Sequence, residues 1–81
     1  MMVNVRLFAR AKDLAASDTV TVELPAHATV GDLRRQLAMK HPRMESLLAH
    51  SVFAVDDEFA DSDSELSPGA EIALLPPVSG G

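Results

Sequence analysis

The residues best suited to chemistry in this sequence are the last two, Gly80 and Gly81. They are two of only four glycines in the chain, and they leave a carboxylate with no side chain beside it. Glycine also lets another group approach the backbone closely. So thin a segment is suited to entering the active site of another protein. The Gly81 carboxylate is therefore the strongest candidate for chemistry.

The residues before this end are expected to give it direction. Pro76 and Pro77 follow a strand that ends in Leu75, and they favour an extended, polyproline-like path that costs less entropy to order. Residues 76–81 would reach roughly 20 Å at about 3.3 Å per residue. We therefore predict a domain over residues 1–75 and an extended tail over residues 76–81. The residues expected to insert into a partner are Pro76, Pro77, Val78, Ser79 and Gly80.

Other groups that could do chemistry match no known pattern. The three histidines have no metal-ligand spacing, and the serines have no nucleophile-elbow context. An EF-hand that began at Asp56 would need glycine and glutamate where the chain has Asp61 and Ser67. These mismatches disfavour a self-contained enzyme, and we expect the domain itself to bind no metal and no cofactor.

The composition limits the class of protein. Eighty-one residues make one small domain, and an apolar content of 47% is typical of a globular fold. No apolar run approaches the roughly 18 to 20 residues that cross a bilayer, so no membrane partner is expected. The start of the chain lacks the pattern of a signal peptide, and there is no cysteine for disulfides. We expect a cytoplasmic protein.

The net charge of −5 is distributed unevenly. Residues 1–43 hold all seven Lys and Arg against four acids, a net charge of +3, whereas residues 44–81 hold eight acids and no Lys or Arg. An acidic second half argues against nucleic-acid binding, which needs cations to displace counterions from phosphates. Two readings stay open: a solvated acidic face, or an acidic surface that steers toward a basic partner.

The apolar pattern predicts the elements that must position the tail. Alternation predicts strands over residues 3–7, 19–24, 51–55 and 70–75, with a short return strand over 59–60 after an acidic turn at 56–58. Helical spacing predicts a main helix that Thr29 caps and Pro42 ends, and short helical pieces over 9–16 and near Met44. The predicted fold class is α+β, with one main helix packed across a small mixed sheet. This order is that of the ubiquitin-like β-grasp.

The whole chain resembles the small subunits of molybdopterin synthase, the ubiquitin-like sulfur carriers of molybdenum-cofactor biosynthesis. The resemblance is carried by residues 7–10 and 29–33, by Val55, and by Pro68-Gly69 followed by residues 71–81. The closing Pro-Pro-Val-x-Gly-Gly is its most specific part. The chain departs from the family at Asp56, where asparagine is frequent.

This resemblance implies a carrier cycle. An adenylyltransferase of the ubiquitin-activating type would adenylate the Gly81 carboxylate with ATP, and sulfur from a sulfur-donating enzyme would replace AMP to leave a thiocarboxylate. The tail would enter the large catalytic subunit and give its sulfur to cyclic pyranopterin monophosphate. The family also implies a heterotetramer of two small and two large subunits.

Docking requires a surface, and three apolar residues are candidates for it. Phe8 lies in register with the outward residues of its strand, Leu75 lies opposite the inward Ile72 and Leu74, and Phe59 follows the acidic turn. We hypothesise that Phe8, Phe59 and Leu75 form an apolar patch for the large subunit and the activating enzyme. The alternative is that one or more of them belongs to the core.

Three other functions remain open. One is a sulfur carrier for thiamin or cysteine synthesis, and another is a protein modifier that forms isopeptide bonds through Gly81. The third is a β-grasp interaction module whose tail has no role.

Overall fold

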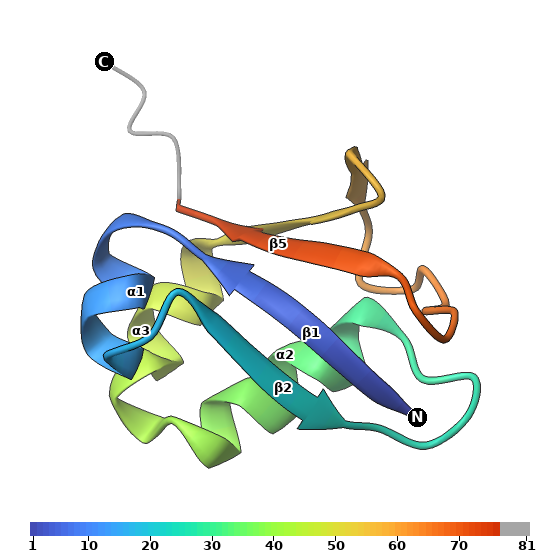
Figure 1. Cartoon of the computed structure of the whole chain (residues 1–81), viewed down its shortest axis with the longest axis horizontal. Helices are drawn as coiled ribbons and strands as arrows, with labels where there is room; N and C mark the ends of the chain where they lie inside the picture. Colours follow the sequence, from blue (N-terminus) through green and yellow to red (C-terminus); the bar gives the residue numbers. More distant parts are fainter. Residues whose placement is uncertain (77–81) are drawn as a thin grey trace.

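The computed structural model describes residues 1–76, which form one mixed sheet with helices over one of its faces (Figure 1). The strand order is β2-β1-β5-β3-β4. The strands are β1 (Met2–Leu7), β2 (Thr19–Glu23), β3 (Val52–Val55), β4 (Glu58–Ala60) and β5 (Glu71–Leu75). The helices are α1 (Ala9–Ala15), α2 (Val30–Lys40), the 3₁₀ turn η1 (Pro42–Met44) and α3 (Glu45–His50). None of these helices has the length and apolar character that a membrane span requires.

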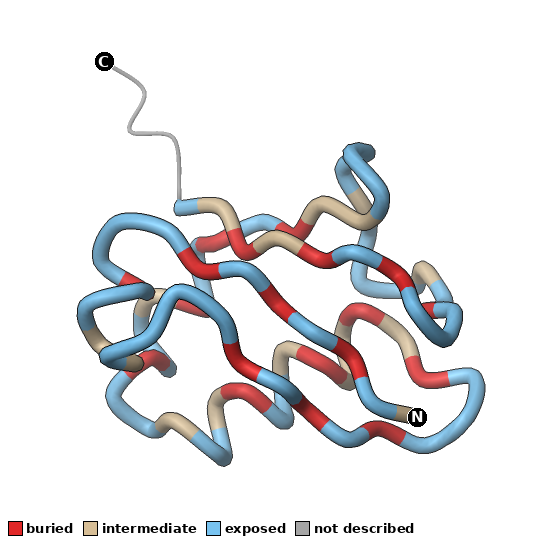
Figure 2. The backbone as a smooth tube through the Cα atoms, in the orientation of Figure 1, coloured by how far each residue is buried: buried red, intermediate tan, exposed pale blue. Residues whose placement is uncertain are grey.

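Alternating burial along the strands builds the core between the sheet and α2. In β1 every second residue is buried, as predicted for Val3, Val5 and Leu7, and the same alternation recurs in β2 and β5 (Figure 2). Helix α2 contributes residues that are fully shielded from solvent: Val30, Leu33 and Leu37. The opposite face of the sheet is left without a covering layer in the described part of the chain.

The neighbouring strands β1 and β5 run parallel, which sets the direction of the chain end. β1 pairs antiparallel with β2 and parallel with β5. β5 also pairs antiparallel with β3, and β3 with β4. This arrangement, with α2 packed across the sheet, confirms the predicted ubiquitin-like β-grasp.

Helix α2 begins with a reciprocal capping box. The Thr29 hydroxyl accepts a hydrogen bond from the Asp32 amide at 3.2 Å, and the Asp32 carboxylate accepts one from the Thr29 amide at 2.9 Å. The bond from the Thr29 amide holds the pKa of the Asp32 carboxyl below its ordinary value. The capping box thereby satisfies two backbone donors at this helix end. The prediction of a Thr29 cap is confirmed.

Several predicted boundaries were wrong by one residue, because β1 begins at Met2, α1 ends at Ala15, β2 ends at Glu23 and β5 begins at Glu71. Two further differences have a local cause. Ser51 does not open β3 but closes α3, because its amide donates to Leu48 O and its hydroxyl donates to Leu47 O at 2.7 Å. Glu58 belongs to β4 and not to the acidic turn, because it pairs with Val55. In both cases a hydrogen bond to a residue four or fewer positions away sets the boundary, and polarity alone does not reveal it.

The β3–β4 turn consists of two residues in the left-handed region, Asp56 at φ 50° and Asp57 at φ 70°. Hairpins with two such residues favour Asn-Gly or Asp-Gly. Asp56 also contacts the neighbouring strand, because its carboxylate accepts from the Glu71 amide at 3.0 Å and its amide donates to Glu71 O at 2.8 Å. These two bonds tie the turn to β5.

Replacing Asp57 with glycine is expected to stabilise the protein by about 0.5 to 1 kcal/mol. Release of left-handed strain at this position outweighs the larger chain entropy of glycine in the unfolded state. Urea denaturation measures the change. Asp56→Gly serves as the control and is expected to gain nothing, because it removes the carboxylate that binds Glu71. A lower stability for Asp57→Gly would contradict this account of the turn.

Candidate functional site

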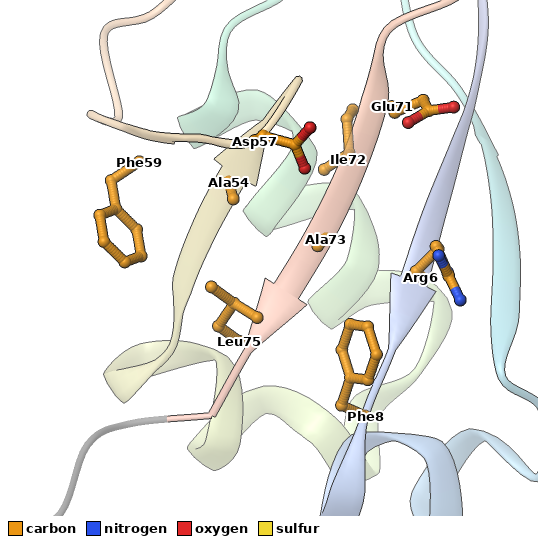
Figure 3. A pocket seen from close by; sticks show the side chains of 9 residues that line it. All are labelled: Arg6, Phe8, Ala54, Asp57, Phe59, Glu71, Ile72, Ala73 and Leu75. Carbon is orange, nitrogen blue, oxygen red and sulfur yellow. The ribbon is translucent and has the colours of Figure 1, made fainter.

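The uncovered face of the sheet carries a hollow of about 350 Å³ near the end of β5. Figure 3 shows the nine residues that line it, contributed by β1, β3, β4, β5 and the segments that adjoin them. Phe8 and Leu75 lie at one end of the hollow, and Phe59 lies to the side of β3 (Figure 3). The hollow opens to solvent on this face, so another protein surface could reach it.

Strand register explains why these residues share one face. Ala73 in β5 pairs with Arg6 in β1 and with Ala54 in β3, and Ala54 pairs with Phe59 in β4. Residues directly opposite one another in neighbouring strands point to the same side of the sheet. A row of side chains therefore crosses the face from Arg6 to Phe59.

A second row lies next to it, at the end of β5. Phe8 follows β1 in extended conformation, so the alternation continues and its side chain joins the uncovered face. Leu75 pairs with Val52, which is 42% exposed. The two rows together give an apolar patch on the uncovered face. We call this the apolar patch, and its members are Phe8, Val52, Ala54, Phe59, Ala73 and Leu75.

All three predicted docking residues lie in the apolar patch. Phe59 is 80% exposed, Phe8 is 39% exposed and Leu75 is half-buried. An exposed cluster of large apolar side chains is typical of a binding surface. Their binding of a partner stays a prediction, because exposure alone does not identify what covers them.

Sequence reasoning missed the other members of the apolar patch. Val52 and Ala54 alternate with the buried Phe53, and Ala73 alternates with Ile72 and Leu74. The sequence therefore indicates that the side chains of Val52, Ala54 and Ala73 point away from the core. It does not indicate their position beside Leu75, because that position depends on the pairing of β3 with β5 across a long stretch of chain.

Charged residues flank the apolar patch. The Arg6 guanidinium lies 5.7 Å from the centre of the Phe8 ring, a cation–π distance. Asp57 and Glu71 also line the hollow, at the end away from Phe8 and Leu75 (Figure 3). Residues 1–76 contain no group of three or more His, Cys, Asp or Glu that could hold a metal ion. The described surface therefore presents apolar and charged side chains that a partner could contact.

The predicted tail begins where this surface ends. Leu75 is the last residue of β5 and Pro76, the next residue, is exposed. The remaining predicted tail residues lie outside the described part of the chain: Pro77, Val78, Ser79, Gly80 and Gly81. The apolar patch therefore adjoins the point from which the tail would extend.

The sequence matches a known family over almost its whole length. The model of the ThiS family matches residues 5–81. The molybdopterin synthase sulfur carrier subunit of Chlamydomonas reinhardtii is 36% identical over 83 residues, covering 100% of both chains.

Solved structures share the fold. The crystal structure of small archaeal modifier protein 1 from Haloferax volcanii aligns with a TM-score of 0.86 and 36% identity over 100% of both chains. A structure from Helicobacter pylori, a complex of subunits 1 and 2 of molybdopterin-converting factor, contains a chain that aligns with a TM-score of 0.71 and 28% identity, again over 100% of both chains.

Proposed function

The chain belongs to the ThiS family, and on that premise we propose that it is the sulfur-carrier subunit of a molybdopterin synthase. The observation that carries the proposal is the 36% identity, over the full length of both chains, to a carrier subunit of that enzyme. The position of the apolar patch supports it, because a carrier must hold its partner close to the place where its own tail begins.

The chemistry proposed for the tail takes place on Gly81. A carboxylate is a poor electrophile, so an activating enzyme first joins it to AMP from ATP, with release of pyrophosphate. A sulfur-donating enzyme then supplies sulfur at the oxidation level of sulfide, which attacks the acyl adenylate, displaces AMP and leaves a thiocarboxylate. Since the sulfur is carried on the terminal carbonyl carbon, the chain needs no cysteine. In this cycle the domain carries the thiocarboxylate to its acceptor, and the partner enzymes supply the catalytic groups.

The acceptor proposed for the sulfur is cyclic pyranopterin monophosphate in the active site of the large subunit. Two such transfers complete the dithiolene of molybdopterin. The assembly proposed is a heterotetramer of two small and two large subunits, located in the cytoplasm. The Helicobacter pylori complex of the two subunits supports a partner of this kind.

Reconstitution with purified components tests this function. The chain carrying a thiocarboxylate, mixed with the large subunit, is expected to convert cyclic pyranopterin monophosphate to molybdopterin, detected by fluorescence of its oxidised derivative. The unmodified chain in the same mixture is the control and should give no product. A thiocarboxylated chain that binds the large subunit but yields no molybdopterin would contradict the proposal.

Protein modification is the second candidate function, and one observation favours it. Small archaeal modifier protein 1 of Haloferax volcanii is 39% identical over 88 residues, covering 94% of this chain. In this function Gly81 would form an isopeptide bond with lysines of other proteins. Tagged chain expressed in its own host would then appear in covalent conjugates that survive denaturation. A sulfur carrier for thiamin or cysteine synthesis is the third candidate. The reconstitution described above distinguishes it, because its acceptor is cyclic pyranopterin monophosphate.

A further inference from the structure

A second hollow, of about 290 Å³, lies among the helices and is basic. Its walls come from α1 on one side and from η1 and α3 on the other. Arg10, Arg43 and His50 line it together with the partly buried Leu14 and Leu47. We call this the basic pocket. The sulfur-carrier chemistry proposed above makes no use of it.

The cations of the basic pocket have no acidic partner within the described part of the chain. The ion pairs of residues 1–76 join His27 to Glu65 and Arg35 to Asp32, and neither involves the pocket. Asp13 and Glu45 share its helices, but they do not line it and form no ion pair with its cations. Arginine presents a planar fork that suits carboxylates. Two guanidinium groups without an ion-pair partner, beside two apolar side chains, are therefore complementary to an acidic segment.

Strand register places the basic pocket at the same end of the sheet as the apolar patch. Leu7 pairs with Leu74, so α1 begins beside the end of β5. Val52 pairs with Leu75, so α3 ends at the same edge (Figure 1). Arg10 follows Phe8 by two residues, and His50 precedes Val52 by two.

The two surfaces lie on opposite sides of the point where β5 ends. The apolar patch is on the uncovered face of the sheet, whereas the basic pocket is in the helical layer on the other face. Both surfaces thus flank the end of β5, where a partner that receives the tail would make contact.

We propose that the basic pocket is a second docking site, which binds an acidic segment of the large subunit that receives the tail. The inference rests on the proposed function and deepens it by assigning the helical layer a part in recognition. The apolar patch supplies buried contact area, and the basic pocket supplies orientation and faster association, as charged groups at an interface rim do. Together they hold the partner on both sides of the tail.

Charge-neutralising variants test the proposal on the full-length chain and the purified large subunit. Arg10→Gln with Arg43→Gln is expected to raise the dissociation constant about tenfold, chiefly through slower association, and to weaken the dependence of the rate on salt. Lys12→Gln with Arg35→Gln removes the same charge from outside the pocket and serves as the control. Circular dichroism of each variant verifies its fold.

The possible results separate this inference from the function on which it rests. If both double variants raised the dissociation constant equally, or if neither raised it, the basic pocket would not be a specific docking site. Failure of the wild-type chain to bind the large subunit would overturn the proposed function, and this inference with it.

A cross-linking experiment provides a second and independent readout. Arg10→Lys with Arg43→Lys keeps the charge and introduces amines that a carbodiimide can join to a neighbouring carboxylate. Mass spectrometry is expected to find the introduced lysines joined to Asp or Glu of the large subunit. Cross-links only to another copy of this chain would contradict the proposal and point to self-association instead.

Discussion

Removal of Gly81 alone will abolish sulfur transfer and leave the domain as stable as the full-length chain. The buried core of the described residues ends at Leu74, and β5 ends at Leu75, so the deletion touches no packing contact that the structure describes. The carboxylate itself would remain, but it would be one residue short and would end in Gly80. Positioning errors of about 1 Å at a reacting group can cost about a hundredfold in rate, and one extended residue spans about 3.3 Å.

The measurement pairs molybdopterin formation with thermal unfolding. Product from the shortened chain should fall to the level seen without any carrier, while its melting temperature stays that of the full-length chain. Met39→Ala in α2 is a control that changes an exposed side chain and leaves the tail intact, and it should retain activity. Substantial sulfur transfer by the shortened chain would show that Gly81 is not required to carry the sulfur.

Replacing Phe59 with alanine will weaken the complex with the large subunit without destabilising the domain. Phe59 is 80% exposed, so its ring makes few contacts with the core, and its loss should change the unfolding free energy little. An aromatic residue that anchors an interface contributes about 2 kcal/mol or more, which corresponds to roughly a thirtyfold rise in dissociation constant.

The chain offers a matched control for this variant. Met39 in α2 is 74% exposed, and α2 covers the opposite face of the sheet, so Met39→Ala should leave the affinity unchanged. Isothermal titration with the large subunit measures both variants. Unchanged affinity for Phe59→Ala together with lost stability would assign Phe59 to the fold and remove it from the docking surface.

The sequence was a good guide wherever structure depends on local pattern. Period-two burial identified β1, β2 and β5, and the Thr29 cap and Pro42 delimited α2 within a residue. The outward direction of Phe8 and Leu75 followed from the same alternation. Each of these features depends on residues a few positions apart, which a single sequence displays.

Features that depend on distant pairing could not be predicted in this way. The parallel pairing of β1 with β5 and the register that sets Val52 beside Leu75 join residues far apart in the chain. Val52 belongs to the apolar patch only because this register places it beside Leu75. The basic pocket likewise forms only when α1 meets η1 and α3, and Arg10 and Arg43 give no sign in the sequence of lying together.

Mass spectrometry of the intact chain, after incubation with its activating enzyme, ATP and a sulfur source, tests the central claim most directly. The account predicts a product heavier by the difference between one sulfur and one oxygen atom, with the change located on Gly81 by fragmentation. An unmodified chain, under conditions that produce a thiocarboxylate on an established carrier, would contradict the account.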